Sequence, residues 1–442
     1  MRAFIASSIG VTCAAALVLP LAAPAGAAPD TPAHPTTAGS RPAEASGPAE
    51  VPGSTQSLAL DPLASPSVRA TGAPAAAAAE QGLPERDVRP FSMVGVVWDD
   101  VNTELHGTAQ VRTRATGTGR WSDWQDLETH NAEHSADAGT AERDSGAARG
   151  STAPLWVGDS DGVEVRVRPE TPDTRDASAT PVPLPAGLHL ELVDPGRDPQ
   201  ETTATGAAGA DRTAPLGATA LPALSRTATE EAAGLAPGAK PFIGPRPRIV
   251  TRKGWGADEK LRESGFAYTK TVKAAFIHHS ATGNNYKCSQ APSVLRGIYR
   301  YHVKSSGWRD IGYNFAVDKC GNIYEGRAGG VTKAVMGAHT LGFNTNTMGI
   351  AVLGTFSKSN PPAAAVTAVS KLTAWKLGLF GANPKGKVTL TSGGSNKYKK
   401  GKKVKLNVIS GHRDGFATEC PGARLYKKLG TARTGSARLQ GR

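Results

Sequence analysis

Cysteine is scarce in this chain of 442 residues, which contains only Cys13, Cys288, Cys320 and Cys420. Cys13 lies in segment 1–28, where Arg2, an apolar stretch and a run of small residues form the pattern of a secretory signal peptide that is removed. If two of the three remaining cysteines form a disulfide, one thiol is left over. No later stretch approaches the ~20 consecutive apolar residues of a membrane span. We therefore expect an exported, soluble protein without a transmembrane segment.

Two long segments, 29–85 and 196–245, are poor in the large apolar side chains from which a core is built. Both consist mainly of Ala, Pro, Thr, Ser and Gly, and such compositions bury too little apolar surface to offset the entropy of the chain. We predict a disordered segment at 29–85 and a linker at 196–245. Residues 86–195 and 246–430 are then the folded regions, followed by a basic tail, 431–442.

Residues 86–195 alternate between apolar and polar side chains in short runs such as FSMVGVVWDD and GVEVRVRP. This period of two, interrupted by Gly and Asp, predicts a small antiparallel β-rich domain of unknown role, with a loose loop at residues 131–151. Its tryptophans form either a sugar-stacking surface or part of the core, and the core is the commoner outcome; they are Trp98, Trp121, Trp124 and Trp156. We find no catalytic pattern in this region.

Residues 246–430 show strand and helix patterns in alternation. Apolar residues at helical spacing after an early proline predict a helix over 289–305. Further helices are predicted at 361–379 and 421–429, a hairpin around 319–321 and a central strand at 348–353. The order indicates an α/β fold with a mixed central β-sheet flanked by helices.

The stretch GHRDGFATECPG contains the first candidates for chemistry, His412 and Cys420. A thiolate and an imidazole bind Zn²⁺ readily, and a third nitrogen ligand would complete an open catalytic site. The apolar run before His278 and His279 reads as a buried strand that ends at the edge of a sheet. Adjacent residues on a strand point to opposite faces, so we expect only one of these two histidines at the site.

Five motifs together carry a resemblance to a known family: IHHSAT, DIGYNF, MGAHTLGFNTNTMGIAVLG and the two parts of GHRDGFATECPG. In this order and spacing they resemble the peptidoglycan recognition protein family, which is akin to the zinc amidases of the phage T7 lysozyme type. The resemblance covers about residues 246 to 430. It implies a zinc-dependent N-acetylmuramoyl-L-alanine amidase. The bias towards Ala, Arg, Gly and Pro suggests a bacterial source, and the predicted signal peptide suggests a secreted member.

The resemblance also assigns roles to individual residues. It implies that His278, His412 and Cys420 bind Zn²⁺, which would leave the site with a charge near +1 and one position for water. Tyr313 takes the place of the family's catalytic tyrosine and would donate to the developing oxyanion, the alternative being a packing role beside Phe315. Thr418 matches a position that is lysine in the phage enzyme and would polarise the same carbonyl.

The loop that contains His339, Asn344 and Asn346 lines the muramyl-peptide groove in the family, although turn residues fit the two asparagines almost as well. A disulfide between Cys288 and Cys320 is the default in an exported protein. The alternative is that one of these two cysteines binds zinc instead of His278. His279 is interpreted as structural. The proton donor to the leaving amine stays unassigned.

Acidic residues are unevenly distributed between the two halves. Residues 1–245 contain 17 Lys and Arg against 30 Asp and Glu, a balance of −13, whereas residues 246–442 contain 34 against 8, a balance of +26. An exported polycation favours anionic cell-wall polymers as partners rather than nucleic acid. The densest cluster of positive charge lies in residues 384–410, which we predict to form a hairpin; the alternative is a solvated loop without a binding role. The lysines of this cluster are Lys397, Lys399, Lys400, Lys402, Lys403 and Lys405.

Two hypotheses on function follow. The favoured one is a secreted zinc amidase that cuts the bond between N-acetylmuramic acid and L-alanine in peptidoglycan. The alternative is a non-hydrolytic peptidoglycan-binding protein whose zinc is structural or vestigial. The presence of Cys420 and Tyr313 favours the first.

Overall fold

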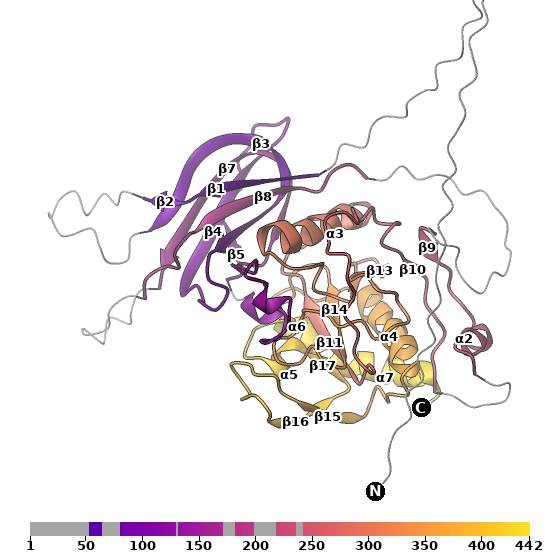
Figure 1. The fold of residues 1–442 in the computed structure, drawn as a ribbon. Helices are drawn as coiled ribbons and strands as arrows, with labels where there is room; N and C mark the ends of the chain where they lie inside the picture. Colours follow the sequence, from indigo (N-terminus) through magenta and orange to yellow (C-terminus); the bar gives the residue numbers. More distant parts are fainter. Residues whose placement is uncertain (1–52, 64–79, 130, 171–181, 199–217, 236–241) are drawn as a thin grey trace, which may run out of the picture. The chain divides into compact units, whose positions relative to one another are not determined.

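A computed structural model of the chain describes residues 53–63, 80–129, 131–170, 182–198, 218–235 and 242–442. The predicted signal peptide, 1–28, lies outside these residues. The described chain contains an all-β part followed by an α/β part with a mixed sheet and flanking helices (Figure 1). The predicted fold class is therefore confirmed.

The all-β part is an antiparallel sheet of eight strands. They are β1 (Ser54–Ala59), β2 (Asp61–Pro62), β3 (Gln81–Trp98), β4 (Gly107–Ala115), β5 (Gln125–Leu127), β6 (Gly150–Ser151), β7 (Leu155–Pro169) and β8 (His189–Asp194). The main order is β1-β8-β3-β7-β4-β5, and β2 and β6 both pair with β3. Alternate residues of β3, β7 and β8 point into one core, which includes Val94, Val165 and Leu190. This is the period of two that the sequence shows.

The predicted disordered segment, 29–85, is wrong where the structure describes it as strand. All six residues of β1 pair with β8, from Ser54 opposite Asp194 to Ala59 opposite His189, and β3 already begins at Gln81. The low-complexity composition conceals these strands because their backbone partners lie far along the chain, in β8 for β1 and in β7 for the start of β3. The β-rich domain thus begins at β1 rather than at the predicted residue 86.

The four tryptophans divide between the two alternatives. Trp98 and Trp156 are buried in the cores, as the commoner outcome predicts. Trp121 and Trp124 are half-buried and stack with arginines of the sheet, with the guanidinium of Arg166 3.9 Å from the Trp124 ring centre and that of Arg112 5.3 Å from both rings. Guanidinium groups therefore cover these two rings.

The α/β part is organised on a seven-stranded mixed sheet. Its strands are β9 (Ala220–Leu221), β10 (Ile249–Val250), β11 (Ala274–His279), β12 (Phe315–Val317), β13 (Ile323–Glu325), β14 (Thr347–Val352) and β17 (Ile409–Gly411). The order is β17-β11-β14-β12-β13-β10-β9. Four neighbouring pairs are parallel, namely β17 with β11, β11 with β14, β14 with β12 and β13 with β10. Strand β11 is buried along its whole length, as its apolar run predicts.

Helices cover both faces of this sheet (Figure 1). They are α2 (Arg226–Ala232), α3 (Ala291–Arg300), which continues as the π-helix η4 (Tyr301–Ser305), α4 (Ala363–Gly378), α5 (His412–Gly415), α6 (Ala423–Tyr426) and α7 (Leu429–Gln440). Helices α4 and α7 pack on the face that Ile350 occupies, and α3 packs on the face of Ala351. None of the helices in the described part has the length and apolarity to span a membrane.

Two predictions are wrong where the structure describes the chain. The predicted linker, 196–245, and the predicted basic tail, 431–442, both contain regular secondary structure. Within the first, β9 pairs with β10 of the sheet, and Ser225 caps α2 by accepting a hydrogen bond from the Ala228 N–H at 3.2 Å. The second is most of α7, whose Leu429 and Ala432 pack into the core. Their weak local patterns gain stability from the sheet and α4, which a short segment alone does not reveal.

The lysine-rich hairpin forms as predicted, from β15 (Lys387–Thr391) and β16 (Lys403–Asn407). Leu390, Val404 and Leu406 bury one face of it against Phe276 and Phe343. The opposite face and the tip hold the six lysines of the cluster, all of which are exposed.

Candidate metal centre

Two neighbouring parallel strands deliver the first two candidate ligands. His278 is at the carboxyl end of β11, and His412 follows the last residue of β17 as the first residue of α5. Because β11 and β17 are parallel, with Ile277 opposite Gly411, their carboxyl ends lie at the same edge of the sheet. The two imidazole rings are 4.5 Å apart between centres and fully buried.

Cys420 reaches the same edge through the loop that follows α5. Its backbone N–H donates to Thr418 Oγ1 at 3.1 Å, and its carbonyl accepts from the Arg413 N–H at 3.0 Å. The sulfur lies 3.8 Å from His278 Nδ1. The structure therefore brings together the three residues that were predicted to bind zinc.

A fourth residue, His134, completes this cluster and was not predicted. It ends the short helix η1 (Ala132–His134), in the connection between β5 and β6 of the all-β part. One potential ligand atom from each of His134, His278, His412 and Cys420 lies within 4.8 Å of the others. The His134 ring centre is 4.4 Å from that of His412 and 5.2 Å from that of His278.

Burial keeps the three imidazoles neutral. It lowers the pKa of His134 to about 3, and it lowers the pKa values of His278 and His412 well below the usual range, with the neighbouring histidines adding to the effect. Burial also raises the pKa of the Cys420 thiol, and the carboxylate of Glu128 raises it further. A bound cation would favour the thiolate instead.

These residues fit a zinc ion. Both ring nitrogens of His134 and of His412 are buried without a hydrogen-bond partner among the described residues, an arrangement that costs free energy unless another group satisfies them. Imidazole nitrogen and thiolate sulfur form the donor set that zinc prefers. The remaining nitrogen of His278, Nε2, is 3.5 Å from Thr340 Oγ1, the kind of contact that orients a metal-binding ring.

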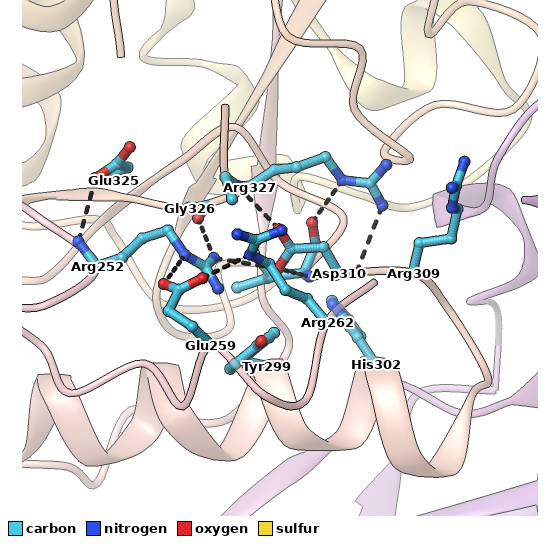
Figure 2. A network of polar contacts seen from close by, with 12 residues as sticks. Arg252, Glu259, Arg262, Tyr299, His302, Arg309, Asp310, Glu325, Gly326 and Arg327 are labelled. Atoms are coloured by element: carbon cyan, nitrogen blue, oxygen red, sulfur yellow. Dashed lines mark hydrogen bonds and ion pairs between the residues drawn. The ribbon is translucent and has the colours of Figure 1, made fainter. Parts of the chain in front are cut away.

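Tyr313 lies beside the cluster, with its ring centre 5.5 Å from that of His278. Its loop is held by a buried polar network (Figure 2). Arg252 Nη1 donates to Asp310 Oδ1 at 3.1 Å and to the Gly326 carbonyl at 2.7 Å, and Arg327 Nε donates to the Ile311 carbonyl at 2.9 Å. Burial raises the pKa of Tyr313 well above its usual value, so the phenol keeps its proton.

Thr418 was predicted to act on the substrate carbonyl, and here its hydroxyl donates to Glu133 Oε1 at 2.7 Å. Glu133 immediately precedes His134. Burial raises its pKa to about 7, against the opposing effect of its hydrogen bonds. The carboxylate nearest to the predicted catalytic group thus comes from the all-β part of the chain.

The three predicted groove residues lie in and next to the turn between residues 339 and 346. Asn344 Oδ1 accepts from the backbone N–H groups of His339 and Thr340, and its Nδ2 donates to the Ser135 carbonyl and to Asp137. His339 is buried, with Nδ1 3.0 Å from Thr340 Oγ1. Asn346 has a left-handed backbone, φ 60°. Asn344 therefore stabilises the turn, the alternative that the sequence left open.

Two further predictions concern neighbours of the site. Cys288 and Cys320 form the predicted disulfide, and Cys420 is left as a thiol, so neither paired cysteine replaces His278. His279 points away from the cluster: Nδ1 accepts from the Phe356 N–H at 3.4 Å, and Nε2 lies 3.3 Å from Glu128. This agrees with its interpretation as structural.

Sequence reasoning missed the residues that the all-β part contributes. Residues 131–149, which we call the His134 segment, were predicted as a loose loop. They instead reach the site through His134, Glu133, Asp137 and Glu142. A histidine among alanine, serine and acidic residues gives no local signal of metal binding, and only the concentration of four acidic residues in this segment distinguishes it.

Comparisons with known proteins agree with this division of the chain. Residues 268–423 match the family described as N-acetylmuramoyl-L-alanine amidase, and residues 42–186 match the one described as Rv3811 N-terminal galactose-binding domain-like. Peptidoglycan-recognition protein SC2 of Drosophila simulans is 31% identical over 185 residues, which are 41% of this chain and 85% of the relative. Peptidoglycan-recognition protein LE of Drosophila melanogaster is 37% identical over 126 residues, 28% of this chain and 35% of the relative. Among solved structures, Drosophila PGRP-LB is 27% identical, with 42% of this chain and 93% of that chain covered and a TM-score of 0.33.

Proposed function

Because the chain belongs to the peptidoglycan recognition protein family, we propose that it hydrolyses the amide bond between N-acetylmuramic acid and L-alanine in peptidoglycan, with zinc as cofactor. The observation that carries this proposal is the convergence of His278, His412 and Cys420 beside Tyr313. A purely binding protein has no need of a buried thiol and unpartnered imidazoles next to a tyrosine phenol.

His278, His412 and Cys420 are the residues that would hold the ion. When bound, zinc supplies Lewis acidity and a water whose pKa falls to ~7, so that attack on an amide becomes possible at neutral pH. The requirement for two neutral imidazoles is already met by burial. His278 is kept in place by β11 and by its contact with Thr340.

The chain's own donors then stabilise the charge that develops on the carbonyl oxygen. Tyr313 keeps its proton and lies against the metal-binding rings, so it is the first donor; such donors are worth ~10²- to 10³-fold in rate. Thr418 is the second, once its hydroxyl is released from Glu133. We assign the muramyl peptide to the groove bounded by the turn that carries His339, Asn344 and Asn346.

We further propose that the protein acts outside the cell, where its substrate is found. The six exposed lysines of the β15–β16 hairpin would hold it on anionic cell-wall polymers. They lie on a different face of that hairpin from the residues packed against Phe276 and Phe343, so this attachment is separable from the chemistry.

The test is direct. Purified protein loaded with zinc is incubated with soluble muropeptides, with and without a chelator, and released stem peptide is measured by mass spectrometry. The proposal predicts chelator-sensitive release that Cys420→Ser abolishes. If neither the native chain nor the His134→Ala variant releases stem peptide, the chain is a binding protein instead.

A further inference from the structure

The metal cluster contains one protein ligand more than a hydrolytic zinc site uses. We propose that His134 is the fourth protein ligand of the metal in the full-length chain, and that the His134 segment thereby keeps the amidase site closed. This inference rests on the proposed function, since it concerns the same metal. It makes the chain, as folded here, a latent enzyme whose all-β part is the inhibitor.

The donor geometry supports four protein ligands. Catalytic zinc sites keep three protein ligands and an exchangeable water, whereas sites with four protein ligands are closed. The four donors lie within 4.8 Å of one another, compared with ~3.3 to 3.8 Å between neighbouring donors around tetrahedral zinc. A small contraction brings them to coordination distance. Both nitrogens of the buried His134 ring lack a hydrogen bond of good geometry among the described residues, which leaves them able to bind the ion.

The His134 segment is fixed to the α/β part on both sides of His134. At the metal, Thr418 donates to Glu133, and the Leu341 N–H donates to the Glu133 carbonyl at 2.8 Å. Three residues beyond His134, Asp137 Oδ1 accepts from the Gly342 N–H and from Asn344 Nδ2, each at 2.7 Å. These contacts determine where the imidazole lies and leave it little freedom to move away.

The strongest anchor is the ion pair between Glu142 and Arg327. The two guanidinium nitrogens donate to the two carboxylate oxygens at 2.8 and 2.7 Å, and each side chain is only 7% exposed. The Arg309 N–H adds a hydrogen bond to the same carboxylate at 3.3 Å. Arg327 is itself fixed by the polar network of Figure 2. Its guanidinium is therefore already oriented to bind the Glu142 carboxylate.

The same contacts occupy the groups that the reaction requires. The segment accepts the hydrogen bond of the Thr418 hydroxyl and those of the Gly342 N–H and the Asn344 side chain. Its His134 would also occupy the coordination position that a catalytic site leaves to water. The His134 ring also lies 5.9 Å from the Tyr313 ring. A substrate amide therefore reaches the metal only after the segment leaves. Such a closed state lowers apparent activity by the fraction of molecules that are open.

Charge favours the closed state as well. The segment carries four acidic residues against Arg143 and Arg149, a balance of −2, whereas residues 246–442 have a balance of +26. Opposite charge steers the acidic segment towards the basic part. The unusual charge asymmetry of the sequence thus has an intramolecular use, in addition to any attraction to cell-wall polymers.

The first experiment reads the coordination sphere, not activity. The full chain is loaded with Co²⁺ in place of zinc, and its visible spectrum is recorded with and without azide, which binds an exchangeable position. Azide should leave the visible spectrum of the native chain unchanged and should change that of His134→Ala. The variant should also lose its metal to a chelator at least ~10-fold faster, since even the outer contacts of a metal ligand change metal affinity by ~10- to 100-fold. His106→Ala, an exposed histidine of the same β part, should behave as the native chain does.

X-ray absorption of the zinc protein provides the ligand count. Three imidazoles and one sulfur in the native chain, and two imidazoles in His134→Ala, support the inference. An azide response in the native chain equal to that of His134→Ala, or two imidazoles in both, overturns it. Circular dichroism verifies that the variant is folded. If the variant is not folded, the azide response and the ligand count of the native chain still decide whether its metal has four protein ligands.

The second experiment measures release of the block. The variant His134→Ala/Asp137→Asn/Glu142→Gln removes the ligand and two anchors but none of the proposed catalytic residues. It should release stem peptide at least ~10-fold faster than the native chain at equal zinc content. Equal, measurable rates refute the closed state. If the metal readouts match expectation and no variant cleaves, the closed site stands and the amidase function fails, so the two failures are distinguishable.

Discussion

Replacing Glu142 with glutamine should detach the His134 segment without unfolding the protein. The substitution removes the charge that pairs with buried Arg327 and leaves that guanidinium one neutral amide oxygen in place of the carboxylate, besides the backbone carbonyls of residues 310, 311 and 336. Breaking a buried ion pair from one side costs ~3–5 kcal/mol. At 1.4 kcal/mol for each factor of ten, the population of the detached state should rise ~10²- to 4 × 10³-fold.

Hydrogen exchange of two backbone amides reports this directly. The Leu341 N–H donates to the Glu133 carbonyl, and the Gly342 N–H donates to Asp137, so both exchange when the segment leaves. The Gly349 N–H, which donates to Asn314 inside the α/β part at 2.8 Å, is the internal control. Glu164→Gln, which affects the Glu164–Arg112 ion pair of the β sheet, is the matched control variant. Unchanged exchange at residues 341 and 342 in Glu142→Gln would refute the reasoning.

Acid should detach the segment in the native chain for the same reason. Burial alone would raise the pKa of Glu142, but the Arg327 guanidinium outweighs burial and holds that pKa below its usual value. The pair therefore contributes its full stability above the unfolded pKa of ~4.3 and loses it as the pH falls through the lower folded pKa. Corrected for intrinsic rates, exchange at residues 341 and 342 should accelerate below about pH 4.

Three further predictions concern the proposed enzyme. Cys420→Ser should lower zinc content and abolish hydrolysis with the fold retained, because the thiolate is a ligand; full activity without bound zinc would contradict the assignment. Tyr313→Phe, measured in the His134→Ala background, should keep zinc and lose ~10²- to 10³-fold in rate, and an unchanged rate would return Tyr313 to a packing role. Changing the six hairpin lysines to glutamine should reduce sedimentation with cell walls at low salt and spare cleavage of a soluble muropeptide, because exposed charges are screened by salt and none of the six lysines is a candidate metal ligand; equal wall binding at low salt would leave them as solvated residues.

The sequence alone indicated the three candidate ligands of the C-terminal part through five motifs in order and spacing, although each motif by itself is a weak signal. The buried run before His278 predicts a strand end, and the glycine and proline around His412 and Cys420 predict a loop beside it. Parallel strands then bring their carboxyl ends together whatever the rest of the chain does. The α/β class, the Cys288–Cys320 disulfide and the lysine hairpin follow from equally local rules of spacing and composition.

The sequence did not reveal the structure of segments whose stability comes from partners. Strand β1 is ordered because β8 pairs with it, and α7 is ordered because α4 and the sheet bury its apolar side. Neither segment contains enough apolar residues to predict this order by itself. Low-complexity composition measures what a segment contributes to a core, and it does not measure what other segments contribute to that segment.

Only the tertiary structure placed His134 in the cluster with His278, His412 and Cys420. Nothing within NAEHSAD distinguishes a ligand from a surface histidine, and 144 positions separate it from His278 in the numbering. Its place is decided by contacts with residues far along the chain, above all Glu142 with Arg327 and Asp137 with Gly342. The sequence determined that three residues can bind zinc because local patterns place His278 and His412 at the ends of adjacent strands and Cys420 in the loop that follows. The fold decided whether a fourth position stays open, because that depends on which distant segment covers it.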